Sequence, residues 1–222
     1  MYKYDETRNL IEEGYVDPKY VSPHCVVQVV EVLDKMRKHS LETYYHLVDV
    51  ANLTRLLFDN KELGLSEQQK IEIYTAGLLH DVGKLAVPTE ILHSKFDENS
   101  KSKIRDYIQL PHIAKSKEIL DQIIDDKIIV DIAYKHHEKI DGSGYPRGLK
   151  GEEIDLASRI VQVADVTSAI MMPRSYRQDS MDIERASALL KDMATKGELD
   201  ARVVDMMCEQ IAIYNPTDEF IK

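Results

Sequence analysis

The chain has 222 residues, 43% of them hydrophobic, and a formal net charge of −10. This composition is typical of a folded domain and excludes a disordered or low-complexity chain. The acidic balance argues against broad binding to nucleic acids or to anionic membranes, and no apolar run approaches the ~20 residues of a membrane helix. The polar N-terminus lacks the features of a signal peptide, so a cytoplasmic location is expected. Cys25 and Cys208 are expected to be buried free thiols.

Helical periodicity dominates the chain, and no strand-rich region or repeat is present. Ser66 and Gln69 have the spacing of a capping box, which predicts a helix start. Longer helices are expected over residues 26–38, 41–58, 67–79, 101–109, 113–124, 127–137, 156–172, 181–194 and 200–214. A short helical turn is expected over residues 88–92 and a loop over residues 94–102. The fold class is therefore all-α, with a helical extension (residues 1–38) packed on a catalytic domain (residues 39–222).

His80 and Asp81 stand together where an apolar helix ends. Neutral imidazole and carboxylate are ligands that divalent first-row metals accept, and the two oxygens of a carboxylate can bridge two ions. A His–Asp pair alone is a weak motif, because a structural role is at least as common.

A second motif, HHE, begins at His136 and is followed by the dense turn sequence DGSGYP (residues 141–146). Adjacent residues on a helix point about 100° apart, so His136 and His137 are expected to serve two neighbouring ions rather than one. Paired surface histidines would not require the ordered sequence HHE-x-x-DG-x-GYP, which makes this motif specific as a whole.

Together, HD-x-x-K (residues 80–84) and HHEKIDGSGYP (residues 136–146) resemble the HD-GYP branch of the HD-domain metal-dependent phosphohydrolases. The resemblance covers residues 41–212 and includes the segments RGLKGEEI, RIVQVADV and PRSYR. It implies a single HD-type helical bundle around two or three divalent metal ions, iron or manganese rather than zinc. It also implies hydrolysis of a cyclic dinucleotide in bacterial signalling.

The resemblance assigns roles position by position. Asp81 is the expected bridge between ions, and Glu42, one helical turn before His46, goes with a third ion. Asp81 and Lys84 are the expected catalytic residues, with Lys84 also meeting a phosphate oxygen. Substrate contacts are expected from Lys84, Tyr145, Arg174 and Arg177. The expected metal ligands are Glu42, His46, His80, Asp81, His112, His136, His137 and Asp165.

Two segments depart from the family pattern. The family's HPE-x-G segment reads HIAKS from His112, so its Pro, Glu and Gly are replaced. Ser168 stands where the family usually has a second aspartate, and Met171 and Met172 replace small polar residues. These replacements leave the shape of the pocket and the preferred base open.

The expected reaction is hydrolysis of a 3′–5′ cyclic dinucleotide, cyclic di-GMP first and mixed cyclic GMP–AMP next, to the linear dinucleotide and, through a third ion, to GMP. The alternatives are another HD phosphohydrolase, acting on nucleotides or guanosine polyphosphates, and a catalytically weak or silent cyclic-dinucleotide-binding module that acts through protein partners. No nucleic-acid polymer or membrane is expected as a partner, while a homodimer or a signalling protein remains open.

Overall fold

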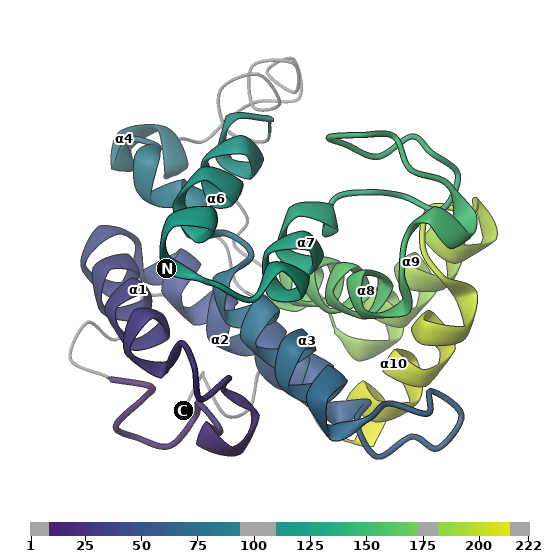
Figure 1. The fold of residues 1–222 in the computed structure, drawn as a ribbon. Coiled ribbons are helices and arrows are strands. Elements are labelled where there is room, and N and C mark those ends of the chain that lie inside the picture. The colour runs from purple at the N-terminus through teal and green to yellow at the C-terminus, as the bar shows by residue number, and fades with distance from the viewer. Residues whose placement is uncertain (1–8, 94–109, 173–181, 214–222) are drawn as a thin grey trace.

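The structure is a computed structural model, and it describes residues 9–93, 110–172 and 182–213 (Figure 1). These residues form helices and no strand, as expected, and the predicted loop 94–102 and helix 101–109 lie outside them. The α-helices are α1 (Val26–His39), α2 (Leu41–Leu56), α3 (Glu67–Leu79), α4 (Thr89–Leu92), α6 (Leu110–Ile123), α7 (Lys127–Lys135), α8 (Leu156–Met171), α9 (Ile183–Thr195) and α10 (Ala201–Ile213). Three short 3-10 helices are η1 (Pro18–Tyr20), η2 (Val82–Ala86) and η5 (Gly151–Glu153).

Side-chain caps fix where several helices begin. Ser66 and Gln69 form the predicted capping box at the start of α3. Ser40 caps α2, and Asp126 and Asp155 cap α7 and α8, each side chain accepting a hydrogen bond from a backbone amide of the first turn. These caps set the register in which each helix presents its site residues.

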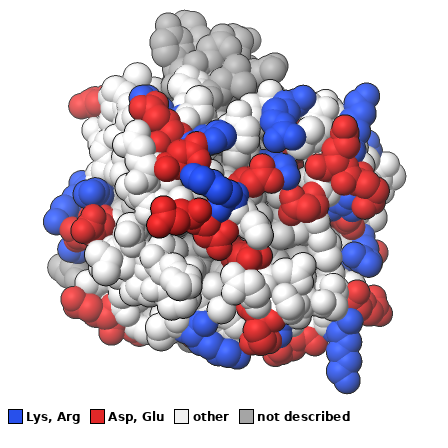
Figure 2. Space-filling model, in the orientation of Figure 1, with Lys and Arg blue, Asp and Glu red and all other residues white. Residues whose placement is uncertain are grey.

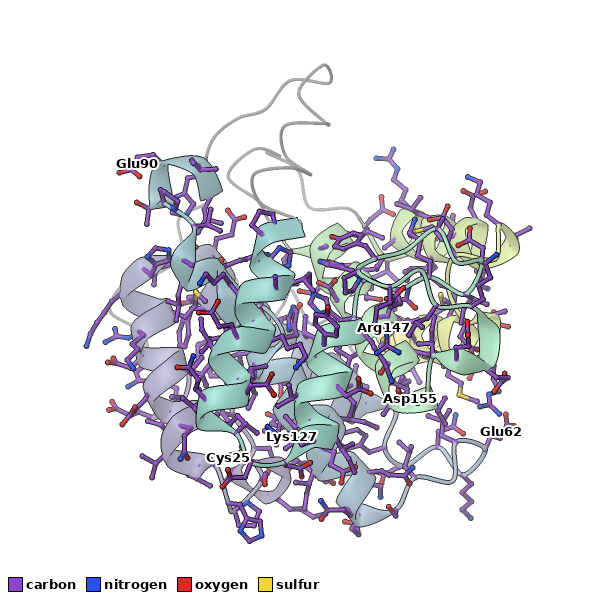
Figure 3. All side chains as sticks on the ribbon, turned by 45° about the horizontal axis from the view of Figure 1, so that its top comes forward. Cys25, Glu62, Glu90, Lys127, Arg147 and Asp155 are labelled. Atoms are coloured by element: carbon purple, nitrogen blue, oxygen red, sulfur yellow. The ribbon has the colours of Figure 1, made fainter. Side chains whose placement is uncertain are left out.

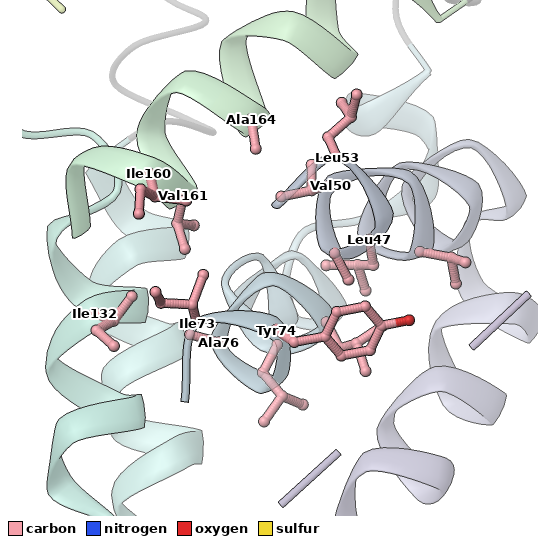
Figure 4. Packing of buried hydrophobic residues seen from close by; sticks show 14 of the residues in the cluster. Leu47, Val50, Leu53, Ile73, Tyr74, Ala76, Ile132, Ile160, Val161 and Ala164 are labelled. Carbon is pink, nitrogen blue, oxygen red and sulfur yellow. The ribbon is translucent and has the colours of Figure 1, made fainter. Parts of the chain in front are cut away.

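Helices α2 and α3 form the centre of the bundle, with α7 and α8 packed against them. Helix α2 is buried on almost every side, as expected for a helix surrounded by others. Figure 4 shows Leu47 and Val50 of α2 facing Tyr74 of α3, with Ile132 of α7 and Val161 of α8 closing the same core. This packing brings the ends of several helices to one place.

Helix α1 packs on α2, α3 and η2. The residues before and within α1 share one continuous apolar core with the rest of the bundle, for example Leu10, Val29 and Leu33. The division between residues 38 and 39 stays a prediction. Cys25 and Cys208 are buried free thiols, as expected. No helix in the described residues is both long and apolar enough to span a bilayer.

Acidic and basic side chains are interspersed on the face shown in Figure 2. Two ion pairs tie the segment after α7 back to that helix. The Lys135 Nζ lies 3.0 Å from the Asp155 Oδ2, and an Arg147 Nη1 lies 3.9 Å from the Asp131 Oδ1. Figure 3 shows Arg147 and Asp155 beside α7. The loop between α7 and α8 is therefore fastened to α7 near its middle and at its C-terminal end.

Candidate metal centre

Seven side chains predicted from the sequence converge on one buried place, and we call them the ligand cluster. They come from three helices and the ends of two more: His46 from α2, His112 from α6, Asp165 from α8, His80 and Asp81 from the end of α3, and His136 and His137 from the end of α7. Within the described residues their donor atoms form three overlapping groups, in each of which all the atoms lie within 4.8 Å of one another. The groups are His46–His80–Asp165, His80–Asp81–His136 and His112–His136–His137.

Asp81 lies between the two sides of the ligand cluster. Its Oδ1 is 3.1 Å from the Nε2 of His112 and 3.9 Å from the Nε2 of His136. Its Oδ2 is 3.5 Å from the Nε2 of His80 and 3.8 Å from the Nε2 of His46. Each oxygen thus faces a different pair of imidazoles, the arrangement that a carboxylate shared by two ions requires.

Two histidines present a nitrogen that has no hydrogen-bond partner. The Nδ1 of His80 lies 2.8 Å from the carbonyl of Gly77, and the Nδ1 of His136 lies 2.6 Å from the carbonyl of Ala133. A carbonyl can only accept, so both rings carry a proton on Nδ1, and the neutral form of each ring leaves its Nε2 lone pair bare. Both Nε2 atoms are buried without a partner, which is costly unless something binds them. This donor set therefore fits divalent metal ions.

Charges within the ligand cluster shift its pKa values. Burial alone would raise the pKa of Asp81, but Lys84 and His80 hold it well below its usual range. Burial likewise opposes ionisation of Asp165, yet the hydrogen bond and charge of His46 keep its pKa low. Burial, together with the charge of His80, lowers the pKa of His136 to about 4. At neutral pH the carboxylates are therefore ionised and His136 is neutral, the protonation states that metal ligands need.

The assignment of His136 and His137 to two neighbouring ions stays a prediction, but the helix that was expected to separate them ends earlier. Helix α7 ends at Lys135 rather than at residue 137, because the amide of Glu138 turns back to the carbonyl of Lys135 (2.8 Å). The pair follows the last residue of the helix, and its ring centroids lie 4.0 Å apart. Both histidines fall in one group with His112, so they can meet a single ion, while His136 also faces the His80–Asp81 side.

Lys84 lies at the edge of the ligand cluster and forms a close ion pair with the Oδ2 of Asp81. Its backbone is held by His39 of α1, whose Nε2 lies 3.2 Å from the carbonyl of Lys84 and 2.9 Å from that of Val87. His39 matches no motif, and the sequence predicts only a surface or packing role for it. In the structure it fixes the turn that carries Lys84.

Ser116 joins the HD turn to α6. Its hydroxyl accepts from the amide of Gly83 (2.9 Å) and donates to the carbonyl of His80 (2.9 Å). A Cβ on Gly83 would lie 2.0 Å from the carbonyl oxygen of His112 and 2.5 Å from the amide nitrogen of Ser116. Only glycine allows η2 and α6 to approach this closely. Ser116 stands at the glycine position of the HPE-x-G pattern, and its hydroxyl makes two hydrogen bonds that a glycine could not make.

The loop after α7, residues 139–151, is shaped by Glu138 and Gly144, and we call it the glycine loop. Buried Glu138 accepts from the amides of Arg147 (2.7 Å) and Leu149 (2.9 Å). A Cβ on Gly144 would lie 2.2 Å from the amide nitrogen of Lys139. Tyr145 donates its amide to the carbonyl of His137 (3.0 Å), and its ring lies 4.8 Å from that of His137. The loop thus sets Tyr145 directly against the ligand cluster.

The remaining predicted residues are not part of these contacts. Glu42 is half-buried one turn before His46 and belongs to none of the three groups within the described residues. Arg174 and Arg177 lie outside the described residues. Ser116, Glu138 and His39 have roles in the site that the sequence reasoning did not assign. For Glu138 the signal was its place in the HHE motif, whereas nothing in the sequence marks His39.

A family model described as an HD domain matches residues 33–203, and the chain therefore belongs to the HD domain family. It is 38% identical over 166 residues to 3′3′-cGAMP-specific phosphodiesterase 1 of Vibrio cholerae, covering 74% of this chain and 37% of that protein. It is 38% identical over 152 residues to the cyclic di-GMP phosphodiesterase response regulator RpfG of Xanthomonas campestris, covering 66% of this chain and 38% of that protein. The chain thus spans less than half the length of these relatives. The HD domain of the L. monocytogenes phosphodiesterase PgpH has the same fold, with a TM-score of 0.60 and 18% identity over 83% of this chain and 97% of that chain.

Proposed function

We propose that this chain is a metal-dependent phosphodiesterase domain that hydrolyses a 3′–5′ cyclic dinucleotide to its linear form, in cytoplasmic second-messenger signalling. One observation carries the proposal. Buried His80 and His136 aim bare Nε2 atoms at an ionised Asp81, each of whose oxygens faces a different pair of imidazoles. Relatives that share 38% of the aligned residues are named as phosphodiesterases of such molecules.

The ligand cluster is the proposed site for two ions, iron or manganese. His46, His80 and Asp165 form one end, and His112, His136 and His137 form the other, with Asp81 between them. Bound there, divalent ions would lower the pKa of a coordinated water and neutralise phosphate charge. That local positive charge is needed because the chain as a whole carries −10. Glu42 is proposed to bind a third ion, which would extend the reaction to the mononucleotide.

The chain's own residues hold and orient the substrate. Lys84 has its ammonium at the edge of the site, where it can exchange part of its contact with Asp81 for a non-bridging phosphate oxygen. Tyr145 faces the site from the glycine loop, stacked near His137, and is proposed to contact the dinucleotide. Arg174 and Arg177 are proposed to grip a phosphate or base.

The substrate class is a cyclic dinucleotide that contains guanine, with cyclic di-GMP and mixed cyclic GMP–AMP as the two candidates. Relatives named for each of them share the same 38% identity with this chain. Overall identity therefore does not choose between them, and the choice depends on pocket contacts such as those of Tyr145, Met171 and Met172.

A turnover assay tests the proposal. Protein loaded anaerobically with Fe²⁺ or Mn²⁺ would be offered cyclic di-GMP, mixed cyclic GMP–AMP and cyclic di-AMP in parallel, with products separated by chromatography. A linear dinucleotide or a mononucleotide from one of the guanine-containing substrates is expected. Metal-replete protein that binds a substrate tightly but releases no product would overturn the enzyme proposal in favour of a binding module. Neither binding nor turnover would direct the search to nucleotides and guanosine polyphosphates.

A further inference from the structure

Three histidines of the ligand cluster differ in what holds Nδ1, the ring nitrogen that they do not offer to an ion. His80 and His136 stand at the C-terminal ends of α3 and α7, where carbonyls of the last turn lack an amide partner in the helix. Each therefore finds an acceptor three residues back in its own chain segment. His46 stands inside α2, which runs from Leu41 to Leu56. There the carbonyls are already engaged in the helical hydrogen-bond ladder, so the Nδ1 of His46 needs a partner from another helix.

Ser168 of α8 is that partner. Its Oγ lies 2.8 Å from the Nδ1 of His46, and the side chain of Ser168 is fully buried. Asp165 precedes Ser168 by three residues on α8, so both side chains lie on one helix face. The Oδ1 of Asp165 lies 3.0 Å from the Nε2 of His46. One helix thus contacts both nitrogens of the same ring.

In its neutral form, which a metal ligand needs, His46 has two tautomers in this arrangement. In one, Nε2–H donates to Asp165, which occupies that carboxylate oxygen and leaves no lone pair on Nε2. In the other, Nδ1–H donates to Ser168, and Nε2 presents its lone pair beside Asp165. Only the second tautomer can act as a ligand in the His46–His80–Asp165 group.

We propose that Ser168 is a positioning residue that stabilises the metal-binding tautomer of His46, by accepting its Nδ1–H while Nε2 binds an ion. The hydroxyl achieves this with a neutral side chain, at a position where the sequence pattern of the family has an aspartate. The inference rests on the proposed metal site, because a tautomer matters only if Nε2 binds an ion. Ser168 does not itself touch the ion or the substrate.

The test compares Ser168→Ala with Thr167→Val. Thr167 is the neighbouring buried residue on α8, and its hydroxyl donates to the carbonyl of Val163, away from the ligand cluster. Both variants delete one buried hydroxyl from the same helix. Metal-free protein would be titrated with Mn²⁺ alone in a calorimeter, after circular dichroism has shown that each variant is folded.

Ser168→Ala is expected to weaken binding of one Mn²⁺ by about 10- to 100-fold, the range typical of partners that orient a ligand. Thr167→Val should bind as the wild type does, and Ser168→Thr, which keeps the hydroxyl, should recover most of the affinity. Equal Mn²⁺ affinity of wild type and Ser168→Ala would overturn the inference while leaving the proposed function standing. Failure of the wild type to bind Mn²⁺ at all would overturn the proposed function as well.

A spectroscopic measurement keeps the inference testable if Ser168→Ala is unstable. In Zn²⁺-loaded protein labelled with ¹⁵N-histidine, long-range ¹H–¹⁵N correlations distinguish the two tautomers. The wild type should show His46 protonated on Nδ1 alone, and Ser168→Asn, which also offers an acceptor oxygen, should show the same pattern. A wild-type His46 that carries its proton on Nε2 would contradict the proposal directly.

Discussion

The ligand cluster and the glycine loop lie side by side but are built in opposite ways. The ligand cluster consists of buried polar side chains, of which His80 and His136 leave Nε2 atoms without a partner. In the glycine loop the backbone amides of Arg147 and Leu149 are both satisfied by Glu138. In the ligand cluster, the unpaired nitrogens cost stability but are able to bind ions. In the glycine loop, satisfied hydrogen bonds fix the shape of the backbone. Substitutions in the two regions should therefore fail in different ways.

The largest effect is expected from Asp81→Ala. Because Asp81 faces imidazoles on both sides of the ligand cluster, its loss removes the group that the two proposed ion positions share. We expect kcat/KM to fall about 1,000-fold, or about 4 kcal/mol of transition-state stabilisation. The measurement is cyclic-dinucleotide turnover together with metal content by elemental analysis. Asp192→Ala on the exposed face of α9 is the control, and unchanged turnover in Asp81→Ala would contradict the proposed mechanism.

The next effect concerns the pH dependence of stability in the metal-free protein. His136 resists protonation down to a pKa of about 4, while the unfolded chain takes up that proton near 6.5. The unfolded state thus binds more protons between these values, so the free energy of unfolding should fall as pH falls, by about 3 kcal/mol. The raised pKa of His80, whose burial is outweighed by Asp81 and Asp165, adds stability that is complete below pH 6.5 and lost above it.

Urea unfolding of metal-free protein between pH 7 and 4.5 measures this slope. His136→Gln removes one titrating ring and should reduce the slope within that window, while His137, whose pKa burial also holds well below its usual value, supplies the remainder. A wild-type protein whose stability is constant from pH 6.5 to 4.5 would show that His136 is not buried in a neutral form. This prediction concerns only the ligand cluster, because the glycine loop holds no group of this kind among the described residues.

A smaller effect, and one of a different kind, is expected from Glu138→Gln. The glutamine side chain keeps an acceptor oxygen for one of the two backbone amides but turns an NH₂ group toward the other. One buried charge-assisted hydrogen bond is therefore lost. The free energy of unfolding should fall by about 2 kcal/mol. The KM should rise because Tyr145 loses its placement, while bound metal stays constant. Glu152→Gln is the matched control, since Glu152 lies just after the glycine loop and its side chain is 95% exposed where it pairs with Arg159. If Glu138→Gln loses bound metal, the glycine loop is needed for metal binding, and the contrast between the two regions fails.

The same contrast explains what the sequence could predict. Helix periodicity and caps placed the longer helices of the described residues to within a few residues, because both depend on neighbours in the chain. The seven residues of the ligand cluster could also be found, since motif spacing carries them. The roles of Ser116 and His39 could not be found, because each bonds to backbone atoms of another segment. For Glu138 the HHE motif marked the residue but not the backbone amides that it accepts from. Which carbonyl or amide a side chain meets is decided by tertiary packing, and no local pattern records it. The end of α7 was predicted at residue 137 but lies at Lys135. The hydrogen bond from the amide of Glu138 to the carbonyl of Lys135 ends the helix there, and helical propensity does not record it.

The smallest effect is expected from Tyr145→Phe. The ring of Tyr145 packs against His137 at 4.8 Å, and phenylalanine keeps that contact while removing the hydroxyl. Loss of one hydrogen bond to substrate should raise the KM about fivefold, or about 1 kcal/mol, without altering metal content. Tyr145→Ala removes the ring as well and should raise the KM more than about tenfold. If the two variants raise the KM equally, the hydroxyl carries the whole contact. If neither changes the KM, the glycine loop shapes the ligand cluster from outside without touching the substrate, and its satisfied backbone serves only to hold His137 in place.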